Sequence, residues 1–201
     1  MRPRLPDQIR LAGVIDNHLI GLLDEPPITP SNIHHIVFIP FAPQCGATTL
    51  IQRLGGAQPR DPNPSAGVNG YRGVWSITQD KSGSILYRSL FLWDCSYDAV
   101  VSCKDIIDSY LQSANVVVLL IPKSSRNLMQ NLIQWYQSNN LHSRRVVIVV
   151  TKSDLVGDSK ITDVDIESLS MACNAKVVQS AISAPLDNVV LAINDNIPTI
   201  S

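Results

Sequence analysis

The sequence predicts an α/β fold with a doubly wound, mostly parallel six-stranded sheet, in which one of the six strands is an antiparallel edge strand. The main observation is that strand-like and helix-like segments alternate along the chain. Two of the strand-like runs, 115–122 and 145–151, are apolar at nearly every position, which is typical of strands that helices cover on both faces. A single hairpin interrupts the alternation, and its outer strand would form the antiparallel edge.

Each element has its own local signal. A short apolar run at 35–41 predicts the first strand, and a helix follows over 46–54. Two β-rich runs, 71–78 and 84–94, flank Asp80-Lys81-Ser82-Gly83, which is a typical hairpin turn. The remaining expected elements are a helix at 98–111, a strand at 115–122, a helix around 128–136, a strand at 145–151, a helix at 162–171, a strand at 176–179 and a helix at 186–194.

A separate extension is expected at the N-terminus, over residues 1–30. Apolar residues within 6–23 recur at helical spacing, and Pro26-Pro27 cannot continue a helix. We therefore predict an N-terminal helix and a proline linker outside the main domain, which would occupy 31–201. The sequence allows this helix to dock either on its own domain or on a partner protein.

Composition narrows the class of protein. The chain has 201 residues, is 45% hydrophobic and has a net charge of −1, so we expect a globular protein without nucleic-acid partners. Its apolar runs are too short to span a bilayer, and its C-terminus lacks the cysteine of a prenylation motif, so membrane contact would require partner proteins. The four cysteines show no C-x-x-C spacing, which favours reduced thiols and a cytoplasmic location.

The turn after the first strand matches a phosphate-binding loop that lacks its cation. The working pattern is G-x-x-x-x-G-K-[ST]. When it is anchored on Gly46, Phe41 takes the first glycine, Ala47 takes the lysine and Thr48 supplies the hydroxyl, with Thr49 next to it. Phe41 would add a side chain where the backbone should approach phosphate. The lost lysine contact is worth about 1.5–3 kcal/mol, so we expect weak phosphate binding.

A base-binding element follows the 145–151 strand. Thr151-Lys152-Ser153-Asp154 matches [NT]-K-x-D, and a carboxylate at Asp154 can accept from two N–H groups on the edge of guanine. The stem of Lys152 can cover the ring face. Asp154 as a plain helix cap is the alternative. Ser180-Ala181, at the end of the next strand, is expected to complete the site.

The residues for catalysis are mostly missing. Asp94 ends the second hairpin strand and, with Thr48, could weakly hold Mg²⁺. The D-x-x-G pattern lacks its glycine, because Ser96 and Tyr97 follow Cys95. No glutamine between Cys95 and Val100 could orient water, and the 55–70 loop has no threonine for a magnesium ion. No catalytic residue is therefore predicted.

In this order, the elements resemble the Ras superfamily of small GTPases over about residues 33–197. Trp93-Asp94-Cys95, the segment Ile20–Pro27 and Ser65-Ala66-Gly67-Val68 are similar to the Rem- and Rab-like small GTPases of the ciliogenesis and planar polarity effector (CPLANE) complex. The resemblance implies a P-loop GTPase fold, GTP or GDP with Mg²⁺, and a backbone contact from Ser180-Ala181 to the guanine oxygen. It also implies a role in cilium assembly at the basal body, with Fuzzy and Inturned as partners.

The departures from the family pattern decide the predicted function. We expect a pseudo-GTPase subunit of a cilium-assembly and planar-polarity complex, which acts mainly through protein contacts and requires no cofactor. One alternative is a slow GTP-binding switch that partners regulate. Another is a GTPase-fold adaptor in vesicle or motor transport, linked to the cytoskeleton.

Overall fold

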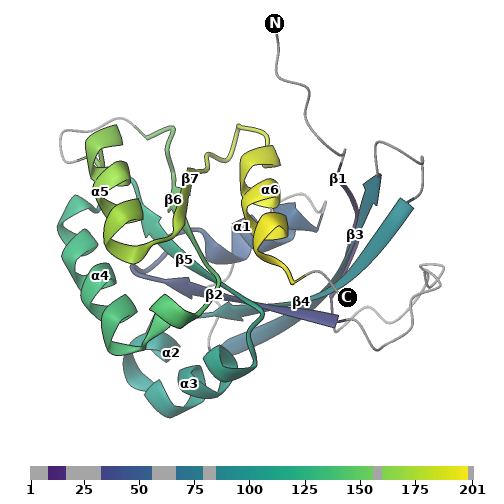
Figure 1. Cartoon of the computed structure of the whole chain (residues 1–201), viewed down its shortest axis with the longest axis horizontal. Coiled ribbons are helices and arrows are strands. Elements are labelled where there is room, and N and C mark those ends of the chain that lie inside the picture. Colours follow the sequence, from purple (N-terminus) through teal and green to yellow (C-terminus); the bar gives the residue numbers. More distant parts are fainter. Residues whose placement is uncertain (1–8, 17–32, 56–66, 79–84, 156–159, 199–201) are drawn as a thin grey trace, which may run out of the picture.

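The computed structural model describes residues 9–16, 33–55, 67–78, 85–155 and 160–198 (Figure 1). They form an α/β fold in which helices cover both faces of one central sheet, and the predicted fold class is confirmed. The strands are β1 (Ile9–Asp16), β2 (Ile33–Pro40), β3 (Val68–Thr78), β4 (Ile85–Cys95), β5 (Val116–Pro122), β6 (Val146–Thr151) and β7 (Lys176–Gln179). The helices are α1 (Ala47–Leu54), α2 (Tyr97–Ser102), α3 (Lys104–Ser113), α4 (Met129–Ser138), α5 (Asp163–Cys173) and α6 (Asp187–Asn196), with 3₁₀ turns at Arg126–Leu128 and Leu141–Ser143.

The sheet has the order β1-β3-β4-β2-β5-β6-β7. Strands β4, β2, β5, β6 and β7 pair in parallel, and β3 pairs antiparallel with β4 as the predicted hairpin. Because β1 pairs antiparallel with β3, it runs in the same direction as β4. The one reversed strand, β3, therefore lies inside the sheet rather than at its edge.

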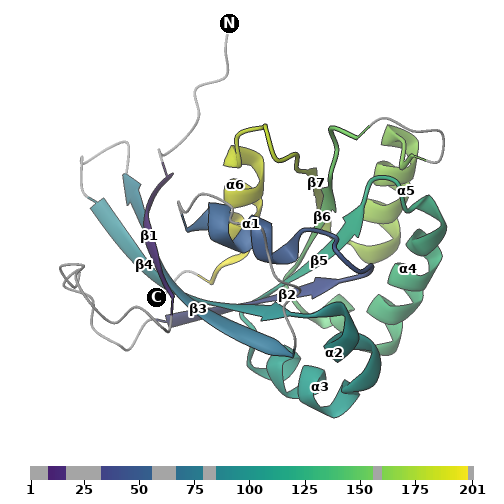
Figure 2. The ribbon, with the colours of Figure 1, turned by 180° about the vertical axis from the view of Figure 1, so that it is seen from behind.

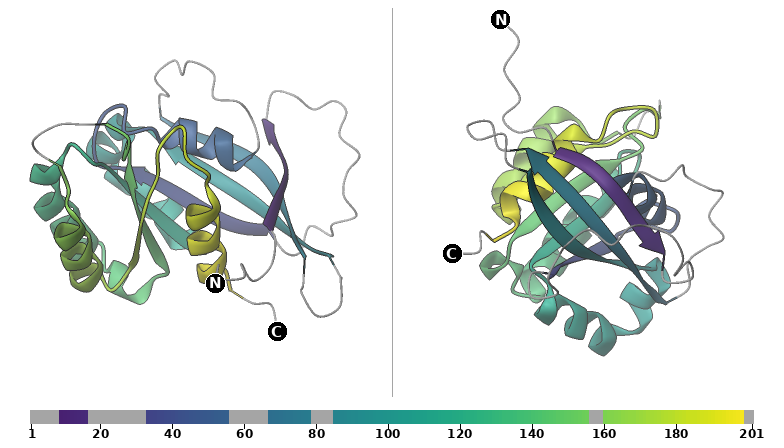
Figure 3. Two further views of the ribbon diagram at one scale, coloured as in Figure 1. Left: turned by 90° about the horizontal axis from the view of Figure 1, so that it is seen from above. Right: turned by 90° about the vertical axis from the view of Figure 1, so that its right-hand side faces the viewer.

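The predicted N-terminal helix is wrong over Ile9–Asp16, which forms the edge strand β1 (Figure 3). This segment pairs with β3 from Ile9↔Ile77 to Asp16↔Tyr71, with a register shift between Leu11 and Gly13. Helical spacing of its apolar residues was a weak signal, because Gly13 disfavours a helix interior and the unpaired edge of β3 supplies backbone partners. The expected domain boundary near residue 30 lies outside the described residues.

Two apolar cores lie on the two faces of the sheet (Figure 2). One contains α1 and α6, whose buried side chains such as Leu54 and Ile193 pack against Ile36 and Phe38 of β2. The other contains α2 to α5 and the alternate β2 residues Val37 and Ile39. The alternation along β2 follows from the two-residue period of a strand. Since β2 is buried on both faces, the turn that follows it is held in place.

The helix predicted over 98–111 is instead two helices. It breaks at Cys103, whose φ of −127° and ψ of 57° are not helical, and the Cys103 carbonyl accepts hydrogen bonds from the N–H groups of Ile106 and Ile107. No proline or glycine marks this break in the sequence, so pattern alone could not locate it. In the described part of the chain, no helix has the length and apolar character needed to cross a membrane.

Candidate functional site

The turn between β2 and α1 has the backbone shape of an anion-binding loop. Gln44 and Gly46 adopt left-handed conformations with φ of 53° and 90°. Glycine adopts this region without cost, whereas the Cβ atom of Gln44 makes it unfavourable there. Helix α1 begins at Ala47, and its N-cap residue, Gly46, makes no side-chain cap hydrogen bond. Such a helix start favours phosphate.

The side chain of Phe41 points into the core and away from this turn. It is 9% exposed, and its ring meets that of Trp135 in α4 edge-on, with centroids 5.5 Å apart and planes at 85°. Its N–H donates to the carbonyl of Leu120 in β5 at 2.9 Å. The expectation that Phe41 stands in the path of phosphate is therefore wrong. The end of β2 turns this residue toward the layer of α2 to α5, where a large ring fits.

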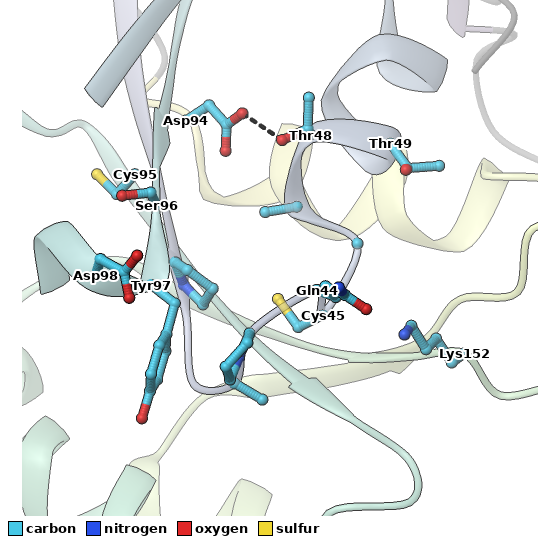
Figure 4. A pocket seen from close by; sticks show the side chains of 15 residues that line it. Gln44, Cys45, Thr48, Thr49, Asp94, Cys95, Ser96, Tyr97, Asp98 and Lys152 are labelled. Atoms are coloured by element: carbon cyan, nitrogen blue, oxygen red, sulfur yellow. Dashed lines mark hydrogen bonds between the residues drawn. The ribbon is translucent and has the colours of Figure 1, made fainter. Parts of the chain in front are cut away.

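A hollow of about 550 Å³ lies between the turn and the start of α2 (Figure 4). Gly46, Ala47 and Thr48 line one side of it, and Asp94 and Asp98 line another. Ala47 is buried and contributes only a methyl group at the position where the working pattern has lysine. Among the residues that line this hollow, the only basic side chain belongs to Lys152.

Thr48 and Asp94 come together as predicted for a metal pair. The Thr48 hydroxyl donates to Oδ2 of Asp94 at 2.6 Å. Asp94 is fully buried, and its Oδ1 has no hydrogen-bond partner among the described residues. Burial raises the pKa of this carboxyl to about 6, and the Thr48 hydrogen bond partly opposes the rise. A buried carboxylate oxygen beside a hydroxyl is the donor set that Mg²⁺ prefers, so these residues fit that ion.

The predicted base-binding residues also come together. Lys152, Asp154, Ser180 and Ala181 line a second hollow of about 300 Å³. The Ser153 N–H donates to the Ser180 carbonyl at 3.1 Å, which joins the ends of β6 and β7. The two hollows are contiguous, because both are lined by Cys45, Gly46, Thr49 and Lys152.

Sequence reasoning missed Arg53, which lines the smaller hollow. From the last turn of α1, its guanidinium donates to the carbonyl of Ala181 at 2.7 Å and to the carbonyl of Ala184. These bonds connect α1 to the loop between β7 and α6. The motif pattern ends at Thr48 and gives no signal for Arg53, although an arginine in a last helical turn often bonds to carbonyl groups.

The cysteines of the site have unreactive surroundings. Cys45 and Cys95 both line the larger hollow, and burial raises the pKa of each thiol to about 12. Both thiols are therefore protonated at neutral pH. All four cysteines are free. The described residues contain no group of three or more histidine, cysteine or acidic side chains placed to hold a metal ion. The 55–70 loop, whose missing threonine bears on catalysis, lies mostly outside the described residues.

The chain is similar to a curated protein of known name. It is 25% identical over 153 residues to ciliogenesis and planar polarity effector 2 of Danio rerio. The matched region covers 73% of this chain and 61% of the zebrafish protein, so the chain spans less than two thirds of that relative. No protein-family model matches the sequence. The match supports a relationship to ciliogenesis and planar polarity effectors.

Proposed function

We propose that this chain is a small-GTPase-like subunit of the ciliogenesis and planar polarity machinery. In this role it acts mainly through protein contacts, binds guanine nucleotide weakly and does not hydrolyse GTP efficiently. The similarity to the zebrafish effector supports the cellular role. The partners we propose are a Fuzzy–Inturned-like pair, and the place of action is the ciliary basal body, reached from the cytoplasm.

The observation that supports the proposal is a turn before α1 whose backbone suits an anion, although Ala47 stands where the working pattern has lysine. Gly46 and the uncapped start of α1 form the anion-binding backbone, and the hollow beside them is open. Ala47 removes a charge-assisted contact to phosphate, equal to roughly 10–100-fold in affinity. Thr48 and Asp94 would hold Mg²⁺, which would offset phosphate charge when bound.

Two measurements test the nucleotide part. Heat-released extracts of the purified chain should contain guanine nucleotide in well under stoichiometric amount, and titration with a fluorescent GDP analogue should give weak binding that Asp154→Ala abolishes. A single-turnover assay should show no appreciable hydrolysis of GTP. Turnover at the rate of ordinary small GTPases, lost in Asp94→Ala, would contradict the proposal.

The partner part has a separate test. The chain should co-purify with a Fuzzy–Inturned-like pair, equally well with GDP, with a GTP analogue or with EDTA. Association that requires the GTP analogue would favour a second candidate, a slow GTP-binding switch. The Thr48–Asp94 contact at 2.6 Å is the observation that favours this switch, because it places both magnesium-binding side chains beside the phosphate loop.

A further inference from the structure

Charge is unevenly distributed along the two joined hollows. Asp154, which can accept from the guanine edge, lies on the smaller hollow, and Lys152 lies where the two hollows meet. Asp94 and Asp98 lie on the larger hollow, on the side of β4 and α2. Figure 4 shows this separation, with Lys152 on one side of the turn and the two acidic side chains on the other.

This order has a consequence for a nucleotide in the site. A base in the smaller hollow places the first phosphates beside Lys152 and the start of α1. Each further phosphate lies farther from Lys152 and closer to Asp94 and Asp98. Asp94 is fully buried, and its Oδ1 has no hydrogen-bond partner among the described residues. Ala47 lines the same hollow and supplies no positive charge to it.

We propose that this site selects guanosine diphosphate over the triphosphate, and that Asp98 is a specificity-determining residue. The inference rests on the proposed function, since it assumes that guanine nucleotide binds here at all. A third phosphate adds negative charge at the end of the ligand that faces the carboxylates. A bound Mg²⁺ would compensate the charge of Asp94, and the remaining repulsion of the third phosphate would come from Asp98. Because Asp98 is exposed, its repulsion should be sensitive to salt.

The chain offers a matched control for Asp98. Asp98 is an acidic residue in the first turn of α2, and Asp105 is an acidic residue in the first turn of α3. Asp105 does not line either hollow. Replacing either aspartate with asparagine removes one negative charge from a helix start, with a similar small effect on helix stability. Only Asp98→Asn changes the charge of the hollow.

The experiment is a titration of the full chain with fluorescent GDP and with a fluorescent, non-hydrolysable GTP analogue, in magnesium buffer at low salt. The wild-type protein should bind GDP roughly 10-fold tighter than the GTP analogue, equal to about 1.4 kcal/mol. Asp98→Asn should narrow this ratio several-fold through tighter binding of the GTP analogue. Asp105→Asn should leave the ratio unchanged. Raising salt to about 0.5 M should narrow the wild-type ratio by screening Asp98.

Three results would overturn the inference, and they differ in whether they also contradict the proposed function. Equal affinity for the two nucleotides, or a preference for the triphosphate, would overturn the selectivity and leave weak nucleotide binding intact. A ratio that Asp98→Asn and Asp105→Asn change equally would remove the assigned role of Asp98. Absence of binding by either nucleotide would overturn both the inference and the nucleotide part of the proposed function.

Discussion

In the proposed nucleotide site, the phosphate side and the base side differ in the groups that they present. The phosphate side has its backbone shape, with Gly46 in the left-handed region and α1 starting directly after it, but no lysine. The base side has its polar side chains, Lys152 and Asp154, and gains a support from Arg53. One side of the proposed site therefore has the backbone shape without the charged side chain, and the other side has the charged side chains.

The difference follows from what determines each property. The shape of the phosphate turn depends on β2 and α1, which are buried on the sheet and contribute to the stability of the whole domain. The charge depends on one side chain, at Ala47, which is buried beside the larger hollow.

The largest expected effect on stability comes from removing the buried ring of Phe41, next to the phosphate side of the proposed site. Phe41→Gly removes a buried ring that packs on Trp135 and should lower the free energy of unfolding by about 3–5 kcal/mol. Urea unfolding measures this change. Phe41→Leu retains most of the apolar volume and should cost about 1.5 kcal/mol or less. Guanine nucleotide affinity of Phe41→Leu should equal that of wild type, and a gain would show that the ring does obstruct the phosphate side.

Phe41 also shows how far the sequence predicted the fold. The alternation of apolar runs predicted six strands of the sheet, because buried strands need apolar segments whichever way their individual side chains point. The direction of a single side chain at the end of β2 depends on strand phase and on the helix layer opposite, and motif alignment does not contain either. The edge strand β1 was missed for a related reason: its pairing partner, β3, lies more than fifty residues away in the chain.

The next largest effect is the pH dependence of stability caused by Asp94. Its folded pKa of about 6 lies above the ordinary 3.8, so the unfolded chain releases this proton at lower pH than the folded one. Stability from this group is therefore complete below about pH 4 and is lost as pH rises through 6, by roughly 3 kcal/mol at most.

Urea unfolding in EDTA, from pH 4.5 to 7.5, compares wild type with Asp94→Asn. Burial lowers the pKa of the His34 and His35 imidazoles, so the stabilising effect of these groups is lost as pH falls, opposite to that of Asp94. Both proteins contain these histidines, so their contribution cancels and the difference in unfolding free energy isolates Asp94. The advantage of wild type over Asp94→Asn should shrink as pH rises. A constant difference would mean that Asp94 has a partner that lowers its pKa.

Restoring the charge at Ala47 tests the phosphate side alone. Ala47→Lys should increase guanine nucleotide affinity by roughly 10–100-fold, since a lysine contact to phosphate is worth about 1.5–3 kcal/mol. Gln130→Lys, which adds the same charge on the exposed face of α4, is the control and should give no gain. Equal affinities for Ala47→Lys and wild type would show that the turn does not present its N–H groups to phosphate.

The site residues were predictable to different degrees. Thr48, Asp94, Lys152 and Asp154 were found because each lies at a fixed spacing from the end of a strand, and the structure places all of them around the joined hollows. Arg53 was not found from the sequence, because its partners are backbone carbonyl groups. Every residue has a backbone carbonyl, so the sequence does not indicate which ones an arginine contacts. Contacts of this kind become visible only when the fold has brought the segments together.

The smallest expected effect tests the base side through Arg53. Arg53→Gln removes two charge-assisted hydrogen bonds to the carbonyls of Ala181 and Ala184. The side chain is only partly buried, so we expect a loss of about 1–2 kcal/mol in unfolding free energy. The matched control is Arg144→Gln, because Arg144 also donates to a carbonyl, that of Gln112 at 3.2 Å, but on the exposed surface away from both hollows. Arg53→Gln should also weaken GDP binding several-fold, whereas Arg144→Gln should not. If Arg53→Gln changed stability but left GDP affinity intact, the loop after β7 would hold its position without α1, and the two sides of the site would be independent in structure as well as in charge.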